Sequence, residues 1–259
     1  GITAKTVAGS TIDNSFVVGN VSGGSYTGGL VGTALGTINN SGVNGKITVG
    51  TYSGGFIGSG GGTISNSYAN AEVVASSASY DWIGGFAGNL YGSVSISNSY
   101  STGNVSGDAN LGGFVGQLNS GGTGLISNSY STSNVYGSSR DLGGFIGLYW
   151  AGISINNSYA KGNVTGGGSA SFVGGFVGEP VLTSPATTIS NSYSTGNLSG
   201  VGSSSGGFFG YMTAAFSCDN LFWDTNTSLP TTKSSAGCTA TGKTTAEMTN
   251  VTTFTDTAT

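Results

Sequence analysis

The sequence predicts an all-β fold: a parallel β-solenoid, or β-helix, of about seven to eight coils near 30 residues each, with a small C-terminal cap. Three observations predict it. A block of two glycines, two apolar residues and another glycine occurs seven times, at spacings of 26 to 32 residues. A second block, Ile-Ser-Asn-Ser-Tyr or a variant, and a third, Gly-Asn-Val or a variant, recur with it. No part of residues 1–210 has a helical pattern.

The three blocks are expected to be short strands separated by corners. Each holds three to five residues rich in Ile, Val, Phe and Tyr, bounded by Gly, Ser or Asn. The first block begins at Gly28, Gly54, Gly84, Gly112, Gly143, Gly174 and Gly206. Corners with positive φ would explain glycine at fixed positions, because glycine adopts such φ values without steric cost.

The composition agrees with a repeat array rather than an ordinary globular domain. The 259 residues include 50 glycines, and only 6% are charged. Without a regular sequence repeat, such a composition would predict a disordered chain. We divide it into an N-terminal cap with a partial first repeat (1–27), the solenoid (28–210) and a C-terminal capping segment (211–259). The chain begins at Gly1 without Met or a signal sequence, and we expect a mature or excised chain.

Like residues are expected to stack on one another in columns along the solenoid. The apolar columns would form a narrow continuous core, and the asparagines an amide ladder that also satisfies backbone groups at a corner. The phenylalanine column is Phe56, Phe86, Phe114, Phe145, Phe176 and Phe208. The aliphatic column is Val21, Ile47, Val73, Val105, Val135, Val164 and Leu198. The asparagine column is Asn14, Asn40, Asn66, Asn98, Asn128, Asn157 and Asn191.

Two further columns leave their role open. The tyrosine column is a candidate contact surface for sugars or a partner chain if it faces outward, and a structural ladder if it faces inward. Its members are Tyr68, Tyr100, Tyr130, Tyr159 and Tyr193. The residue after each phenylalanine is also apolar, from Ile57 to Phe209. Because adjacent side chains in a strand face opposite ways, either a tight corner buries both or one stripe is exposed for a partner.

The C-terminal segment is expected to close the solenoid, since the last rung of such an array needs cover. Cys218 and Cys238 both lie in it and are predicted to form a disulfide if the compartment is oxidising. Thr244 and Glu247 have the spacing of a capping box, which predicts one helical turn at residues 244–248.

Catalysis, cofactors and metals are not expected. The chain has no histidine, and its ten acidic residues are scattered in loops without a recurring partner. Nucleic acid is an unexpected partner because the six basic residues form no stripe. No apolar run approaches the ~18–20 residues that span a bilayer.

The repeating unit, Gly-Gly-[Leu/Phe]-Val-Gly followed by Ile-Ser-Asn-Ser-Tyr-Ser-Thr-Gly-Asn-Val, resembles the GLUG repeat of bacterial secreted and surface proteins, including large adhesins. The resemblance covers roughly residues 12–210, and the segment from Phe222 to Thr255 resembles the tail that commonly follows such repeats. It implies a bacterial, extracellular or cell-surface location and a surface or adhesion role, and it does not imply an enzyme activity. The first copies depart from the pattern, with Gly42 in place of Tyr.

The leading hypothesis is therefore a non-catalytic structural or adhesive surface protein that associates with itself as a homo-oligomer or a fibre, or binds a surface or glycan ligand. One alternative is an ice-binding protein with a flat solenoid face that carries hydroxyl groups. Against it, Thr102, Thr132 and Thr195 share their column with Asn70 and Lys161. The other alternative is a carbohydrate-binding module that uses the tyrosine column.

Overall fold

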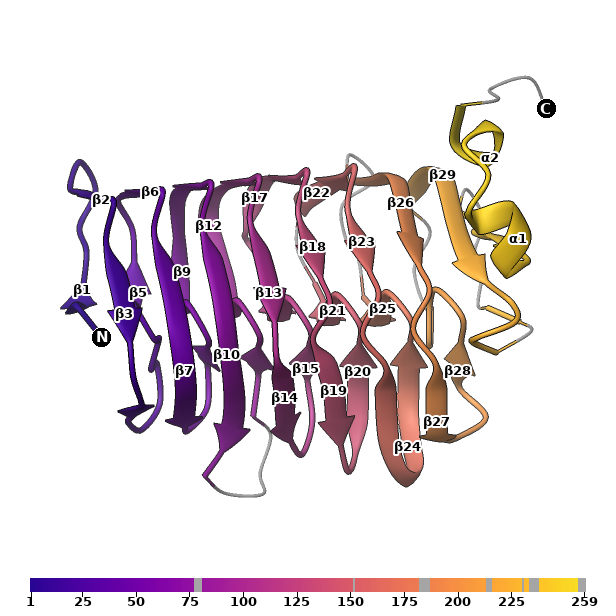
Figure 1. The fold of residues 1–259 in the computed structure, drawn as a ribbon, viewed down its shortest axis with the longest axis horizontal. Coiled ribbons are helices and arrows are strands. Elements are labelled where there is room, and N and C mark those ends of the chain that lie inside the picture. The colour runs from indigo at the N-terminus through magenta and orange to yellow at the C-terminus, as the bar shows by residue number, and fades with distance from the viewer. Residues whose placement is uncertain are drawn as a thin grey trace.

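The structure is a computed structural model that describes residues 1–76, 81–150, 152–181, 187–212, 216–229, 231–232 and 238–255. It is a single stack of coils, with residue 1 at one end and the helices α1 (Thr245–Met248) and α2 (Thr252–Thr255) at the other (Figure 1). Every strand pair is parallel. The predicted all-β parallel solenoid is confirmed.

Each coil passes through five strand positions, and the first follows the Gly-Gly block. These strands are β1 (Thr3–Lys5), β5 (Val31–Ala34), β9 (Ile57–Ser65), β12 (Ala87–Ser97), β16 (Val115–Leu118), β21 (Ile146–Tyr149) and β25 (Val177–Pro180). The second position carries the Ile-Ser-Asn block. It is formed by the later parts of β9 and β12 and by β2 (Thr11–Asp13), β6 (Thr37–Asn39), β17 (Thr123–Ser127), β22 (Gly152–Asn156), β26 (Thr188–Ser194) and β29 (Ser217–Asp224).

The third position begins at the tyrosine column and follows an asparagine corner. Its strands are β3 (Phe16–Val18), β7 (Gly42–Val49), β10 (Tyr68–Ala75), β13 (Tyr100–Thr102), β18 (Tyr130–Ser131), β23 (Tyr159–Ala160) and, at the C-terminal end, β30 (Thr241–Lys243).

The last two positions bring the chain back to the next Gly-Gly pair. The fourth contains β4 (Val21–Ser22), β14 (Asn104–Gly107), β19 (Asn134–Gly137), β24 (Val164–Gly174) and β27 (Leu198–Val201). The fifth contains β8 (Ser53–Gly54), β11 (Ile83–Gly84), β15 (Leu111–Gly112), β20 (Arg140–Gly143) and β28 (Ser205–Gly206).

The register aligns equal positions of successive repeats. Ile64 pairs with Ile96 and Ile96 with Ile126, while Tyr68 pairs with Tyr100 and Tyr100 with Tyr130. Extra residues therefore lie in the connections between the strands, and the strands remain in step. This is why a repeat of irregular length still builds continuous columns.

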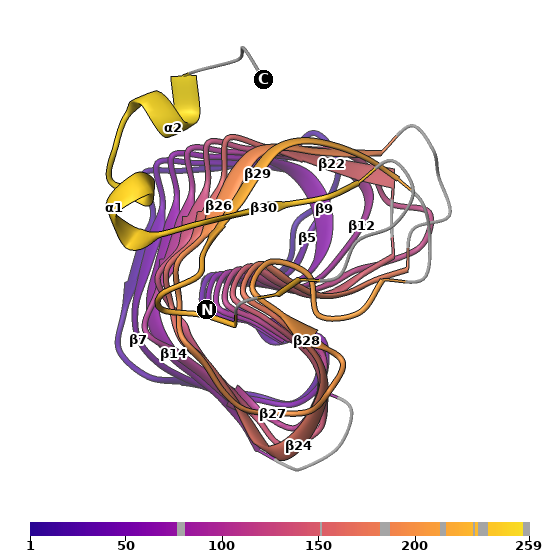
Figure 2. The same ribbon diagram turned by 90° about the vertical axis from the view of Figure 1, so that its right-hand side faces the viewer.

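The core is built on the Gly-Gly block, which runs through the middle of each coil (Figure 2). The side chains of Phe56, Phe86, Phe114, Phe145, Phe176 and Phe208 are fully buried, with neighbouring ring centroids 4.7–4.8 Å apart. The following residue is also fully buried in every coil, at Val31, Ile57, Ala87, Val115, Ile146, Val177 and Phe209. The exposed apolar stripe is therefore ruled out, because this strand is covered on both faces.

The glycines of the first block are not required by positive φ, which was the expected reason. All of them lie in described residues, and none has a positive φ. A Cβ at Gly55 would overlap the carbonyl oxygen of Gly85 in the next coil, and one at Gly113 would overlap the carbonyl oxygen of Gly144. Close approach between backbones excludes a side chain at these positions. Positive φ accounts for glycine only elsewhere, as at Gly103 (φ 111°).

The C-terminal segment first adds strands to the parallel sheet and then covers the end of the solenoid. Strand β29 pairs with β26, so that Cys218 lies beside Ile189 and Phe222 beside Tyr193, and β30 then pairs with residues 222–224 of β29. Cys218 and Cys238 form a disulfide with their Cα atoms 4.9 Å apart. The predicted helical turn is α1, and its capping box joins Thr244 and Glu247 in both directions. Within the described residues, neither helix is long enough or apolar enough to cross a membrane.

Candidate functional site

The asparagine column forms a corner of every coil. Asn14, Asn40, Asn66, Asn98, Asn128, Asn157, Asn191 and Asn220 all have φ between 47° and 50° or, for Asn220, 52°. Asparagine tolerates this left-handed region better than other residues with a side chain. Several side chains also bond along the column: the Nδ2 of Asn98 donates to the Oδ1 of Asn66 at 3.2 Å, and that of Asn157 to Asn128 at 3.2 Å. The asparagine column therefore does two things: it provides the backbone turn at the corner, and its side chains form an amide ladder.

Replacing Asn128 with Ala is expected to lower the free energy of unfolding by about 1–2 kcal/mol, because alanine pays the full cost of the left-handed conformation. The ladder hydrogen bond from Asn157 is lost as well. Denaturation in guanidinium chloride measures the change. Asn128→Gly is the matched control, since it loses the same hydrogen bond but accepts the backbone angle. Equal losses in both variants would contradict a conformational role for this column.

The tyrosine column lies on the outer surface as a continuous, half-buried stack of rings. From Tyr68 to Tyr193 the ring centroids are 4.8–5.4 Å apart and the planes differ by 3–11°. Phe254 of α2 packs on the last ring at 5.5 Å. Burial, and secondarily the neighbouring Tyr159, raises the pKa of Tyr193 to about 12. Each inner ring has neighbours on both faces, so only edges and hydroxyl groups meet solvent.

A second aromatic column was missed by the sequence analysis. Tyr26 stacks on Tyr52 at 5.2 Å, and Tyr52 stacks on Trp82 at 4.7 Å. All three have positive φ, between 49° and 59°, which is unusual for bulky residues. They lie two residues before successive Gly-Gly pairs. That fixed distance from the motif is the signal that could have revealed the column.

The same column contains a buried acidic residue, Asp141. Asn110 and Asp141 take the next two places, and Asp141 is fully buried. Burial is the largest cause of a raised pKa at Asp141, and the neighbouring Glu179 carboxyl adds to it; together they bring this pKa to about 8. The Arg140 Nε lies 3.4 Å from Oδ2 of Asp141 and opposes this shift, but its side chain is half exposed. At neutral pH the Asp141 carboxyl is therefore mostly protonated inside the protein.

The outer face of the second strand position carries two columns of small polar side chains. Strand register places the first as Thr11, Thr37, Thr63, Ser95, Leu125, Ser154, Thr188 and Ser217. The second is Asp13, Asn39, Ser65, Ser97, Ser127, Asn156, Ser190 and Asp219. Hydroxyl groups dominate the first column and fill half of the second, which has a carboxylate at each end.

At its N-terminal end the described solenoid begins with four short strands. Strands β1 to β4 pair on one side only, with β5, β6 and β7. Large apolar side chains are exposed here: Val18 is 82% exposed, Val7 60%, Phe16 57%, Tyr26 51% and Ile2 49%. A cavity of about 340 Å³ opens beside Ile2 and Tyr26. This N-terminal edge, residues 2–26, combines strands that are paired on one side only with exposed apolar side chains.

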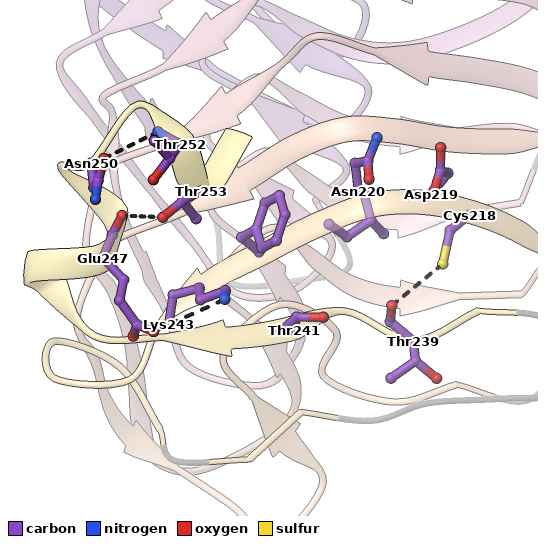
Figure 3. A pocket seen from close by; sticks show the side chains of 12 residues that line it. Cys218, Asp219, Asn220, Thr239, Thr241, Lys243, Glu247, Asn250, Thr252 and Thr253 are labelled. Carbon is purple, nitrogen blue, oxygen red and sulfur yellow. Dashed lines mark hydrogen bonds and ion pairs between the residues drawn. The ribbon is translucent and has the colours of Figure 1, made fainter. Parts of the chain in front are cut away.

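The opposite end holds a polar cleft of about 580 Å³ between β29, β30 and the α1–α2 segment (Figure 3). Asp219, Thr241, Lys243 and Glu247 line it together with the ring of Phe222. The Nζ of Lys243 lies 4.0 Å from a carboxylate oxygen of Glu247. Within the described residues no three acidic, cysteine or histidine side chains are grouped as a metal site.

Together these features define a β-solenoid repeat protein whose distinctive surfaces are its two ends and its polar column faces. Comparison with family descriptions matches residues 138–165 to the GLUG motif. This stretch covers one coil, and the other coils repeat its columns in register, which supports the assignment of the chain to the GLUG-repeat family. The comparison with curated proteins gave no match, and neither did the comparison with solved structures.

Proposed function

We propose that this chain is a non-catalytic, extracellular structural and adhesive protein of bacterial surfaces, and that it associates with further copies of itself through its N-terminal edge. The observation that carries the proposal is the edge itself. It combines β-strands that are paired on one side only with apolar side chains that are 49–82% exposed. Exposed strand edges of this kind pair readily with another chain, and exposed apolar patches mark interaction sites.

The body of the solenoid fits a rigid spacer. Stacked phenylalanine rings, the asparagine corners and the outer tyrosines run through successive coils without interruption by a hinge in the described residues. The Cys218–Cys238 disulfide supports an oxidising, extracellular compartment, since such bonds persist there. Its GLUG motif supports a surface role in general terms.

The geometry favours pairing of two N-terminal edges over continuous head-to-tail stacking. At the C-terminal end, β30 already occupies the edge of residues 222–224. Head-to-tail stacking in register would also bring Asp13 of one copy beside Asp219 of the next, because both belong to the same column. Like charges directly opposite each other are destabilising. Pairing of two N-terminal edges avoids the occupied C-terminal edge and makes an isologous contact.

Replacing Val18 with Lys is expected to weaken self-association at least ~10-fold, because a charge would have to be buried in the contact. Analytical ultracentrifugation of the purified chain measures it, and electron microscopy shows whether the assemblies are pairs or polymers. Thr102→Lys is the matched control. It lies in the same column at mid-body, where Lys161 already shows that a lysine is accommodated. A wild-type chain that stays monomeric at millimolar concentration would overturn the proposal.

Ice binding is a second candidate because of the first column on the outer face of the second strand position, which consists almost entirely of hydroxyl-bearing residues. Threonine or serine occupies seven of the eight places in the first column, and only Leu125 interrupts it. Parallel strands hold these hydroxyl groups in a regular array. Thermal hysteresis or faceted ice crystals that are lost in Thr63→Lys would favour this function over the structural one.

A further inference from the structure

The polar cleft at the C-terminal end has the chemistry of a ligand site. Its volume of about 580 Å³ falls within the ~300–1,000 Å³ of small-molecule sites. Two strands and the helical segment form its walls, and the Cys218–Cys238 disulfide and the capping box of α1 fix them in place. The cleft is therefore held by covalent and hydrogen-bonded structure.

The charges that line the cleft select against several ligand classes. The carboxylates of Asp219 and Glu247 outnumber the single ammonium group of Lys243, which disfavours anions. The same ammonium disfavours a metal cation, which would also need more ligands than the described residues group together. An apolar ligand would remove these charged groups from water without offering them hydrogen bonds. A neutral ligand with many hydroxyl groups fits best.

Within the described residues, the ring of Phe222 has no ring stacked parallel to it, unlike the inner rings of the tyrosine column. It follows Tyr193 in the register, yet no parallel ring stacks on it, and Phe254 meets it edge to face at 5.5 Å and 89°. In the tyrosine column, each inner ring is covered on both faces by its neighbours. An aromatic ring without a stacked partner packs against the C–H face of a sugar, while polar groups around it hold the hydroxyls.

Hydrogen-bonding groups remain available next to this ring. Among the described residues, the side chains of Asp219 and Thr241 make no hydrogen bond, and Lys243 reaches only the distant contact with Glu247. These three groups offer acceptors and donors on the two strands. A second cavity of about 470 Å³ adjoins the cleft, shares Asn220 and Phe222 with it, and extends toward Tyr159 and Tyr193. Two connected cavities favour a chain of sugars over a single one.

We propose that the C-terminal cleft binds a neutral oligosaccharide, with Phe222 as the stacking surface and Asp219, Thr241 and Lys243 as hydrogen-bonding groups. The site is independent of the N-terminal edge. A surface protein with this arrangement would present a glycan-binding end away from the edge through which its copies associate.

Saturation-transfer NMR and titration calorimetry test the proposal with chitotriose, mannotriose and lactose, and with sialyllactose as an anionic comparison. We expect at least one neutral probe to bind at millimolar or lower concentration and sialyllactose to bind more weakly. Asp219→Ala and Thr241→Val should each weaken binding about tenfold or more, which corresponds to one charge-assisted or neutral hydrogen bond lost.

Matched controls separate this site from the other surfaces. Asp13→Ala removes a carboxylate at the opposite end of the column of Asp219, and Tyr130→Ala removes a ring from the tyrosine column; both should bind as the wild type does. Lack of binding to all three neutral probes would overturn the proposal, and so would unchanged binding in Asp219→Ala or loss of binding in Tyr130→Ala. Asp219→Ala should sediment as the wild type does. A failure of glycan binding can therefore be told apart from a failure of self-association.

Discussion

Replacing Phe114 with Ala is expected to lower the free energy of unfolding by about 3–5 kcal/mol, the range for phenylalanine truncation in a core. Its ring is fully buried between Phe86 and Phe145, with both centroid distances at 4.7 Å. The backbone on either side is locked as well, because the N–H of Phe114 donates to the carbonyl of Phe145. The coils therefore have little freedom to collapse into the space. Guanidinium chloride denaturation followed by circular dichroism measures the loss.

Two variants test that buried stacking is the cause. Phe114→Leu should cost clearly less than Phe114→Ala, because Leu30 holds the same position in an earlier coil and is fully buried there. Tyr130→Ala removes a ring of similar size from the half-buried outer column and should cost less than half as much. Similar losses for Phe114→Ala and Tyr130→Ala would show that the central column is no more important to stability than the surface.

The period and the identity of the repeated residues were sufficient to predict the columns. Because Ile, Asn and Tyr recur at the same places in each unit, stacking unit on unit in register brings like side chains together, as at Tyr100 and Tyr130. The capping box at Thr244 and Glu247 was equally accessible, since it depends on residues three apart. Local and repeated features of this kind do not require knowledge of the cross-section of a coil.

The path of the chain within one coil could not be predicted from the period. Whether Ile57 faces solvent depends on the Gly-Gly block running through the middle of the coil, and nothing in the spacing of the motif says so. The same path explains why Gly55 must lack a side chain although its φ is negative. The aromatic stack of Tyr52 and Trp82 follows from it too, because these residues meet only after the coil closes.

The C-terminal cleft was beyond sequence reasoning for a related reason. Its residues come from β29, β30 and the helical turn, which match no repeated motif, and their proximity depends on how the last rung is covered. In this region the sequence indicated the disulfide between Cys218 and Cys238 and the capping box of Thr244 and Glu247, but not the cleft between them. A site assembled at the point where a repeat ends carries no periodic signal.

Asp141 makes the stability of the solenoid depend on pH. Its carboxyl is fully buried in a column that otherwise holds aromatic rings and Asn110. Burial is the largest cause of its raised pKa of about 8, the Glu179 carboxyl adds to it, and Arg140 opposes it. In the unfolded chain the same carboxyl has its ordinary value of 3.8. Between these two values the folded protein holds a proton that the unfolded chain has released.

The sign of the resulting pH dependence follows from this difference. Stability falls as pH rises wherever the folded state binds more protons than the unfolded state. This carboxyl therefore stabilises the fold most below about pH 4, and its contribution declines by up to about 1.4 kcal/mol per pH unit as pH rises toward 8. Above that value both states are ionised, and the folded protein carries a buried charge beside Glu179.

Replacing Asp141 with Asn is expected to make the protein more stable at pH 8 and to flatten its stability between pH 4 and 8. Asparagine suits the backbone, because φ at Asp141 is 57° and Asn110 adopts 55° at the equivalent place one coil earlier. It keeps the shape of the side chain and removes the charge. Denaturation midpoints at intervals from pH 4 to 9, for wild type and variant, measure the effect.

A second variant separates burial from the neighbouring charge. Glu179→Gln removes the repulsion but leaves Asp141 buried, so it should retain much of the decline with pH, whereas Asp141→Asn should remove it. If the two stability profiles of wild type and Asp141→Asn ran parallel from pH 4 to 8, the buried carboxyl would not be the group that titrates. Because the largest cause of the shift is burial, the fold itself, through the column that encloses Asp141, sets this dependence on pH.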